Sequence, residues 1–448
     1  MDEFLTLTIE EQNNESTIRK YIKKNPEIYF SLQNKLKLKK EIIQETLKQD
    51  PFLFPEFEVE IKENKEYIKF VLNLAGELFE TLDKKFQNDE EIIKIAIKNC
   101  GDCLYFLSED LKNDKEIVKE AIKNSPMSIE YASKDLKNNQ EIVLKAIELN
   151  GNSYQFISEE LKKNFEFTKK AIEINENCFP LINEIFKEDL EIVLLALKKN
   201  GENFQFISPK LQMNRICVLE AVKNNCIIYT FLTNNEFRND KEIILSAVKQ
   251  NGHIIEIIPE EFKNDKEIIL ESVKSTGSAY QFLSKEMKNN REIIKEALKN
   301  DGNVLRELNL LLKKDKELIN IAIEQNGTSL IYATKEIKKD PKFALKAIKN
   351  GLPISMLQFE VWKDKFFVLE IIKLKNCSLF NVSNELKDDK EIVLAFVSNN
   401  GLEIKNASER LRNDPDVASI AINQNPDSYK YLSDDLREKF KKNFEENF

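Results

Sequence analysis

Cys100 and Cys103 are the first residues of this sequence whose type and spacing could do chemistry. They form a lone Cys-x-x-Cys pair, a spacing that occurs in zinc sites and in redox motifs. A zinc site needs a full set of ligands, and no partner pair lies at a useful spacing. We therefore interpret both cysteines as structural residues, with metal or redox use as the alternative. The 6 cysteines are scattered and form no disulfide framework, which predicts a reducing, cytoplasmic location.

The residues that usually serve in acid–base catalysis are histidine, aspartate and glutamate. Here histidine is rare, and the carboxylates have a structural explanation. His253 is the only histidine, which excludes most histidine-based catalysis and metal binding. It follows Asn251-Gly252 in a predicted turn, and we interpret it as an exposed residue without a catalytic role. The abundant carboxylates recur at helix-capping positions, so no catalytic pair stands out, and no phosphate-loop or dinucleotide fingerprint occurs. We expect a protein that is not an enzyme and that uses no cofactor, metal ion or small-molecule substrate.

The composition favours helices over strands. The 448 residues are 42% hydrophobic and 32% charged, and only 10 glycines and 11 prolines punctuate them, which argues against both disorder and an all-β fold. No stretch approaches the roughly 18 apolar residues of a membrane span, and the acidic start lacks the layout of a signal peptide. We therefore expect no contact with a membrane.

One phrase, Leu-Lys-Asn-Asp-Lys-Glu-Ile-Val, recurs along the chain with small variations. We number each copy from the residue just before its Lys-Glu pair, called the anchor, so that position +1 follows it. There are 17 copies at a spacing of 25 residues, interrupted by one spacing of 26 and one of 24. The anchors are Asn14, Lys39, Asn64, Asp89, Asp114, Asn139, Asn164, Asp189, Asn214, Asp240, Asp265, Asn290, Asp315, Asp340, Asp364, Asp389 and Asp414. Such an array predicts a solenoid, because one copy cannot bury its apolar face without its neighbours.

The first half of each copy has the pattern of an amphipathic helix, which we call helix A. Apolar residues fall at +3, +4, +7 and +8, as in residues 117–122, the spacing of one helix face. The anchor, which is Asp or Asn in every copy except that of Lys39, is the predicted N-cap. Alanine is frequent at +7, where it would let neighbouring helices approach closely. Pairs such as Asn150-Gly151 are expected to end the helix in the left-handed conformation.

The second half of each copy carries an apolar pair at +17 and +18, Ser or Thr at +19 and an apolar residue at +22. This pattern predicts a short helix B, a Ser-capped turn and re-entry into the next helix A. The predicted fold is all-α: a superhelical α-solenoid of about 17 tandem 25-residue repeats, each a helix A plus a short helix B. Residues 1–13 are expected to form an N-terminal cap, residues 14–432 a continuous array and residues 433–448 a polar C-terminal capping helix.

The repeat phrase resembles a known family. Residues 111–151 and 386–425 are similar to the helical repeats catalogued as domain of unknown function forty-one sixteen, with their run of Leu-Lys-Asn-Asp, Lys-Glu-Ile-Val and Ala-Val-Lys-x-Asn-Gly. The resemblance covers nearly the whole chain and is strongest over residues 86–327. It implies an α-helical repeat fold, and it brings no established catalytic residues.

A lysine recurs two residues before the anchor. Stacking of the copies would align these lysines into a ladder that could meet the phosphates of a nucleic acid. The alternative, which we favour, is a solvated edge balanced by the glutamates at +2, since a net charge of −9 is not that of a typical nucleic-acid reader. The ladder consists of Lys112, Lys137, Lys162, Lys187, Lys263, Lys288, Lys313, Lys338 and Lys387.

Apolar residues at positions that are usually charged are the best candidates for a partner-binding site. Phe165 and Leu190 stand at +1 of consecutive copies, and the next copy has Met213 at −1 and Ile216 at +2. Equivalent positions of successive repeats are neighbours, so these four residues are expected to form one exposed apolar strip, which is typical of an interface.

A second candidate site surrounds the sole tryptophan. Trp362 replaces the lysine at −2, Phe366 replaces the glutamate at +2, and Phe359 is nearby. Aromatic anchors of this type often dominate binding energy. The alternative is that the shortened copy, which has Pro341 and Pro353 in the same stretch, has repacked and buried them.

We therefore expect a non-enzymatic scaffold or adaptor that binds a partner protein along an extended solenoid surface. An inhibitor is a close variant, because an acidic array could occupy the basic groove of a nucleic-acid enzyme. The alternative is a helical repeat protein that binds nucleic acid through the lysine ladder.

Overall fold

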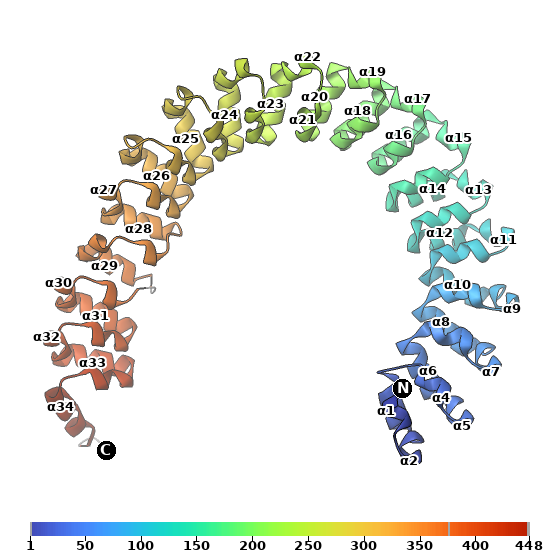
Figure 1. Cartoon of the computed structure of the whole chain (residues 1–448), viewed down its shortest axis with the longest axis horizontal. Coiled ribbons are helices and arrows are strands. Elements are labelled where there is room, and N and C mark those ends of the chain that lie inside the picture. Colours follow the sequence, from blue (N-terminus) through green and yellow to red (C-terminus); the bar gives the residue numbers. More distant parts are fainter. Residues whose placement is uncertain (1, 375–376, 446–448) are drawn as a thin grey trace. The chain divides into compact units, whose positions relative to one another are not determined.

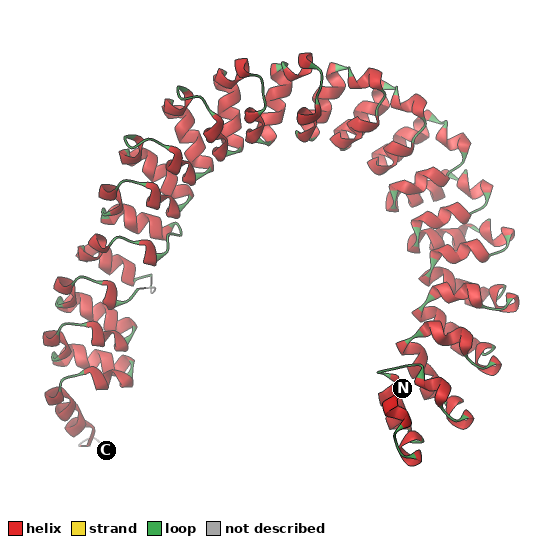
Figure 2. Ribbon diagram, viewed as in Figure 1, coloured by secondary structure: helices red, strands yellow, loops and turns green. Residues whose placement is uncertain are grey.

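The computed structural model describes residues 2–374 and 377–445, and every regular element among them is a helix (Figure 2). The contacts within the chain divide it into two compact units, Met1–Asn224 and Asn225–Phe448. Within each unit, successive repeats pack side by side (Figure 1). The all-α repeat solenoid predicted from the sequence is confirmed.

Helix A is present in all 17 described copies and begins one residue after each anchor. In the first unit these helices are α3 (Glu15–Ile22), α6 (Lys40–Gln49), α8 (Lys65–Leu74), α10 (Glu90–Asn99), α12 (Lys115–Asn124), α14 (Gln140–Leu149), α16 (Phe165–Ile174), α18 (Leu190–Lys199) and α20 (Arg215–Asn224). In the second unit they are α23 (Lys241–Gln250), α24 (Lys266–Ser275), α25 (Arg291–Asn300), α26 (Lys316–Gln325), α28 (Pro341–Lys349), α29 (Lys365–Ile372), α31 (Lys390–Asn399) and α33 (Pro415–Gln424).

The anchor caps helix A as its residue type predicts. The carboxylate of Asp114 accepts hydrogen bonds from the backbone N–H groups of Glu116 and Ile117, at 2.9 and 3.0 Å. Lys39, the exception among the anchors, makes no side-chain cap. The apolar face is buried as expected: Ile293, Ile294, Ala297 and Leu298 of α25 are all 0% exposed.

The second half of each copy holds two short elements instead of one helix B. The first is most often a 3₁₀ helix of five or six residues, as in η1 (Pro51–Glu56), η2 (Gly76–Thr81), η3 (Gly101–Phe106), η4 (Pro126–Tyr131), η5 (Gly151–Phe156), η6 (Glu176–Leu181), η7 (Gly201–Phe206), η8 (Gly252–Glu256), η10 (Gly277–Phe282), η12 (Gly302–Glu307), η14 (Gly327–Tyr332), η18 (Gly401–Asn406) and η19 (Pro426–Tyr431). It is shorter in η15 (Ile354–Met356) and η17 (Leu379–Asn381), and α-helical in α4 (Ile28–Ser31) and α21 (Ile227–Phe231). The prediction of a single helix B is therefore corrected to a short 3₁₀ helix followed by a separate turn of helix.

The turn predicted at +19 is a one-turn helix, and in several copies a serine side chain caps it. In α11 (Glu109–Lys112), for example, the hydroxyl of Ser108 accepts a hydrogen bond from the backbone N–H of Leu111. The α-helical turns are α2 (Ile9–Gln12), α5 (Asn34–Lys37), α7 (Val59–Lys62), α9 (Lys84–Gln87), α13 (Lys134–Lys137), α15 (Glu159–Lys162), α17 (Glu184–Lys187), α19 (Pro209–Gln212), α22 (Asn235–Arg238), α27 (Lys335–Lys338), α30 (Asn384–Lys387) and α32 (Glu409–Arg412). Four copies have a 3₁₀ turn here, namely η9 (Glu260–Asn264), η11 (Met287–Asn289), η13 (Leu312–Lys314) and η16 (Phe359–Lys363). The chain begins with α1 (Asp2–Leu5) and ends with α34 (Asp434–Glu445).

Most glycines after helix A serve close packing between copies, so the left-handed ending expected for pairs such as Asn150-Gly151 is wrong. Asn150 is extended, with φ −153°, and its side chain accepts a hydrogen bond from the N–H of Asn152 at the start of η5. Gly351, with φ 98°, is the only described glycine in the left-handed region. At Gly252, by contrast, a Cβ would lie 2.1 Å from the carbonyl oxygen of Ser272 in the next helix A. A side chain is therefore excluded by the backbone of the neighbouring copy.

An amide side chain at +10 bonds two copies together. Asn300 donates to the carbonyl oxygen of Lys274 at 2.7 Å and accepts from the N–H of Gly277 at 2.6 Å. Asn124 makes the same two bonds to Lys98 and Gly101, at 3.0 and 2.9 Å. The side chain thereby satisfies backbone groups left unpaired where helix A ends.

Replacing Asn300 with leucine is expected to lower the free energy of unfolding by about 1–2 kcal/mol, because it leaves the partly buried N–H of Gly277 without an acceptor. Urea unfolding measures the change. The exposed neighbour Lys299, replaced with leucine, is the control and should change stability by less than about 0.5 kcal/mol. Equal effects of the two substitutions would show that the amide bonds do not join the copies.

Candidate protein-binding surface

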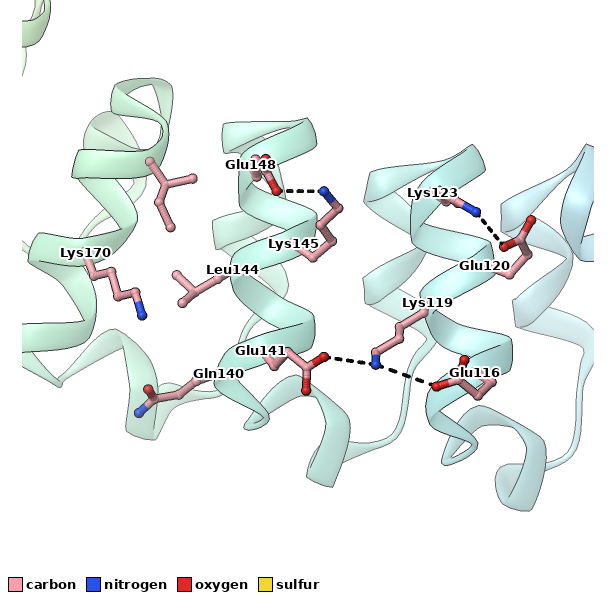
Figure 3. A pocket seen from close by; sticks show the side chains of 11 residues that line it. Glu116, Lys119, Glu120, Lys123, Gln140, Glu141, Leu144, Lys145, Glu148 and Lys170 are labelled. Carbon is pink, nitrogen blue, oxygen red and sulfur yellow. Dashed lines mark hydrogen bonds and ion pairs between the residues drawn. The ribbon is translucent and has the colours of Figure 1, made fainter.

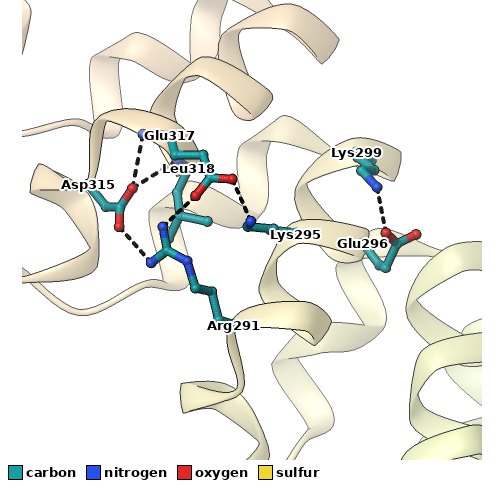
Figure 4. A network of polar contacts seen from close by, with 7 residues as sticks. All are labelled: Arg291, Lys295, Glu296, Lys299, Asp315, Glu317 and Leu318. Carbon is teal, nitrogen blue, oxygen red and sulfur yellow. Dashed lines mark hydrogen bonds and ion pairs between the residues drawn. The ribbon is translucent and has the colours of Figure 1, made fainter.

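In several copies a cationic residue at +1 of helix A forms ion pairs with the next copy. Arg291 of α25 contacts Asp315 and Glu317 at the start of α26, both at 2.7 Å. Lys295 also contacts Glu317, at 2.5 Å (Figure 4). The hydrogen bond from Arg291 lowers the pKa of Asp315, and those from Lys295 and then Arg291 lower the pKa of Glu317. Both carboxyl groups are therefore ionised at neutral pH.

We call the pair formed by +1 of one copy and +2 of the next a rung. Ion-pair rungs in the second unit are Lys241–Glu267 at 2.9 Å, Lys266–Glu292 at 2.6 Å, Arg291–Glu317 at 2.7 Å, Lys365–Glu391 at 2.8 Å and Lys390–Asp416 at 2.7 Å. Exposed ion pairs of this kind contribute little to stability. A copy can therefore lose its rung without unfolding, so the residue types at these positions are free to vary.

One rung of the first unit is apolar. Leu190 at +1 of α18 and Ile216 at +2 of α20 occupy the positions that hold a cation and a carboxylate in the five ion-pair rungs of the second unit. Their side chains are 39% and 54% exposed, and that of Met213, three residues before Ile216, is 61% exposed. Because α18 and α20 pack directly against each other, these three residues form one exposed apolar strip. We call it the α18–α20 strip.

Phe165, the fourth residue predicted for this strip, is half-buried. Its ring lies 6.0 Å from that of Phe186 in a T-shaped arrangement, so it packs against α17, the turn that leads into α18. Ile185 of α17 is 73% exposed and was not predicted, although Glu160 and Lys210 at the same position of neighbouring copies mark it as a departure.

The aromatic residues of the second predicted site are separated by the structure. Trp362 is 4% exposed, and its ring packs in a T shape against Phe367 at 5.6 Å. The prediction that Trp362 contacts a partner is therefore wrong, and Trp362 is a core residue. Phe359 and Phe366 are 58% and 67% exposed. Of the three aromatic residues predicted for this site, these two therefore lie on the surface.

Two further apolar groups of the second unit were missed by the sequence analysis. Leu310 and Leu311, just before η13, are 75% and 81% exposed. Ile331, Met356 and Phe380 occupy +16 of three consecutive copies and are 40%, 51% and 71% exposed. Comparison of each copy with the repeat pattern at −5, −4 and +16 would have found them, because those positions are mostly polar elsewhere.

Seven of the nine lysines of the predicted ladder are bound within the chain. None of the nine is fully exposed, and Lys187 is buried. Four pair with a glutamate three residues earlier, and three donate to a backbone carbonyl seven residues earlier. The ion pairs are Lys112–Glu109, Lys162–Glu159, Lys187–Glu184 and Lys263–Glu260, and the lysines bound to carbonyls are Lys288, Lys313 and Lys338. This edge therefore presents few free ammonium groups to a polyanion.

A groove of ≈ 760 Å³ is lined by side chains of α12, α14 and α16 (Figure 3). Lys119 bridges Glu116 and Glu141, at 3.6 and 2.9 Å. The pairs Lys123–Glu120 and Lys145–Glu148 lie further along the groove. The charges of its walls are thus largely neutralised in pairs, which gives the groove no dominant sign for a ligand.

The cysteines lie in surroundings that suppress their reactivity. The buried thiol of Cys103 donates to the carbonyl oxygen of Gly76 in the preceding copy, at 3.3 Å. Burial raises the pKa of Cys103, and it raises that of Cys178 to about 12. Both thiols are therefore protonated at neutral pH, and thiols are poor nucleophiles and metal ligands in that form.

His253 is exposed, with its Nε2 2.9 Å from the hydroxyl of Ser278 and its ring against Phe282. In the part of the chain that the structure describes, no three His, Cys, Asp or Glu side chains are placed to hold a metal ion. Nor does any helix there have the length and apolar character needed to cross a membrane.

Comparison with protein families matches this chain to the family described as Domain of unknown function (DUF4116). The matches overlap and cover residues 64–112, 89–137, 139–187, 189–238, 218–263, 240–288, 265–313, 290–338, 315–362, 364–408 and 389–437. No curated protein matches the chain. Because the matched segments span most of the sequence and coincide with the stacked copies, the chain belongs to the DUF4116 family of helical repeats.

Proposed function

We propose that this protein is a non-enzymatic scaffold or adaptor that binds a partner protein through the α18–α20 strip. One observation carries the proposal: the rung of Leu190 and Ile216 replaces a cation and a carboxylate by two exposed apolar side chains. Both members of this rung are apolar, so the two neighbouring copies together present an apolar surface where other rungs present an ion pair.

Apolar side chains at this edge gain little from the fold. They lie where ion pairs contribute little to stability, and they are not buried by the neighbouring copy. Burial against a partner would remove them from water and contribute about 25 cal/mol per Å² of apolar surface. Contiguous exposed apolar residues with charged surroundings are typical of protein interfaces.

A protein partner also agrees better with the charges than a nucleic acid does. Seven of the nine ladder lysines are bound within the chain, and the net charge is −9. A polyanion would need a row of free cations, whereas an apolar strip needs a complementary apolar surface.

Replacing Leu190 with lysine and Ile216 with glutamate tests the proposal, because it restores the usual rung. We expect the melting temperature to stay within about 2 °C of wild type, since both side chains are exposed. The partner protein, captured by wild type from an extract of the native host, should be lost or bound at least about tenfold more weakly. Thermal unfolding measures the melting temperature, and quantitative affinity capture with mass spectrometry compares the amount of partner bound by wild type and by the variant.

A matched control makes the same kinds of substitution elsewhere in the first unit. Leu38→Lys with Val59→Glu alters two side chains that are 62% and 61% exposed and lie outside the strip. This control should retain the partner. Retention of every captured protein by the strip variant, or equal losses from both variants, would refute the proposal.

A further inference from the structure

One rung of the second unit brings two positive charges together. Lys316 at +1 of α26 faces position +2 of α28, which is Lys342 in place of the usual glutamate. Five other rungs of this unit join a cation to a carboxylate at 2.6–2.9 Å, and α26 packs directly against α28. The register of the repeat therefore directs both ammonium groups to the same edge.

The neighbouring carboxylates are already bound to other groups. Asp315 pairs with Arg291, and Glu317 pairs with Arg291 and Lys295. Asp340 caps α28 by accepting a hydrogen bond from the N–H of Lys342 at 2.9 Å. Over the described residues, no carboxylate lies within ion-pair distance of Lys316 or Lys342. Both side chains are exposed, so the pair is a local excess of positive charge on an acidic protein.

A groove with one apolar wall begins one copy further along. Phe366 at +2 of α29 is 67% exposed, and it lines a groove of ≈ 700 Å³ together with Leu369 of the same helix and Ala395 of α31. The charged members of this groove are paired, as in Glu391 with Lys365 at 2.8 Å. Because α28 and α29 pack together, the apolar wall of the groove adjoins the two lysines. The groove itself carries no excess of charge, because its charged side chains are paired.

We propose that Lys316, Lys342 and the groove at Phe366 form a second binding site, for an acidic segment of a partner protein that carries one aromatic or large aliphatic side chain. The carboxylates of the segment pair with the two lysines, and its apolar side chain packs against Phe366 and Leu369. The site lies wholly in the second unit and does not depend on the α18–α20 strip.

The spacing of the helices defines the pattern of the segment. Lys342 and Phe366 occupy the same position of adjacent copies, and packed helices are roughly 8–10 Å apart. An extended chain covers this distance in about three residues. Two consecutive acidic residues followed by an apolar residue three positions later therefore suit the site.

A phosphate backbone suits it less well. The two lysines stand at a single rung, whereas a nucleic acid presents one charge after another along its length and gains affinity from many contacts. The acidic protein as a whole repels a polyanion, and the adjoining wall is aliphatic and aromatic. An acidic peptide meets both parts of the site at once.

Fluorescence anisotropy with the full-length protein tests the site. The probe is a labelled peptide, Ser-Glu-Glu-Gly-Gly-Phe-Ser, and the comparison peptides carry Gln for Glu or Ala for Phe. We expect the probe to bind at least about tenfold more tightly than the glutamine peptide, with an affinity that falls as salt is added. The alanine peptide should bind more weakly as well.

Variants assign the binding to the named residues. Lys342→Glu restores an ordinary rung, so it should abolish probe binding without lowering the melting temperature, and Phe366→Ala should weaken binding. Lys285→Glu, an exposed lysine elsewhere in this unit, makes the same change of charge and should bind as wild type does. The variant Leu190→Lys with Ile216→Glu should also bind the probe normally, which separates this site from the strip.

Three results would overturn the proposal. The first is equal affinity for the acidic and glutamine peptides, and the second is unchanged probe binding by Lys342→Glu. The third is a thymidine oligonucleotide that binds wild type more tightly than the probe does and fails to bind the Lys342→Glu variant. That result would show that the site binds phosphate groups.

Discussion

Replacing Trp362 with alanine is expected to lower the free energy of unfolding of the second unit by about 3–5 kcal/mol. The indole is 4% exposed and packs against Phe367, which is itself fully buried. Removing it deletes apolar contacts and leaves a cavity, because the surrounding copies relax only partly. The backbone carbonyl of Trp362 also accepts a hydrogen bond from the N–H of Ser383 in the next copy, at 3.2 Å, so local loosening should spread to that copy.

Denaturant unfolding and amide hydrogen exchange of α29 measure this loss. Phe366→Ala is the control, because that ring is 67% exposed and its removal should cost less than about 0.5 kcal/mol. A Trp362→Ala variant as stable as the control would mean that the tryptophan is a surface residue after all.

Replacing Gly252 with alanine is expected to cost about 2–3 kcal/mol. The new Cβ would lie 2.1 Å from the carbonyl oxygen of Ser272 and 3.0 Å from the Cβ of Thr276. The two copies must move apart to admit it, which strains the hydrogen bond from the N–H of Gly252 to Thr276, now 3.0 Å long. The loss should appear as faster hydrogen exchange in η8 and α24.

Glu176 supplies the matched control for this glycine. It holds the same position, +12, in its own copy, so that copy already accommodates a side chain. Glu176→Ala should therefore leave stability within about 0.5 kcal/mol of wild type. Similar costs at both positions would show that close approach is not the reason for glycine.

The regular part of the fold could be predicted because local chemistry and packing agree at the same residues. Asp114 is both the residue type that caps a helix and the point at which the apolar period begins. Ala121, at +7, is fully buried against the neighbouring copy, as its small size predicts. Because the apolar pattern and, in nearly every copy, the capping residue recur in 17 copies, the sequence predicts both the number of long helices and the residue at which each begins.

The parts that could not be predicted depend on contacts between copies. Gly252 has the sequence context of a left-handed helix end, but its role is set by the carbonyl of Ser272, twenty residues away. Asn300 is an ordinary polar residue in the sequence, and only stacking places its amide between Lys274 and Gly277. A single copy contains neither partner.

The candidate sites were predicted where a departure from the repeat changes residue chemistry at an exposed position. Leu190 and Ile216 were found in this way. Trp362 is an equally clear departure but is buried, because position −2 is partly covered in other copies too, as at Lys187, and the indole packs there against Phe367. Lys316 and Lys342 were missed, since each lysine is unremarkable alone and only the register of the rungs shows that they face each other.

Site-specific photo-crosslinking at Met213 tests the central claim most directly. A photoreactive amino acid at this position, which is 61% exposed, is predicted to link one partner protein in the native host. The same amino acid at the equally exposed Val59 should not link it, and the product should vanish in the background of Leu190→Lys with Ile216→Glu. The same products from both positions, or a product that persists in that background, would contradict the claim that the α18–α20 strip binds a protein.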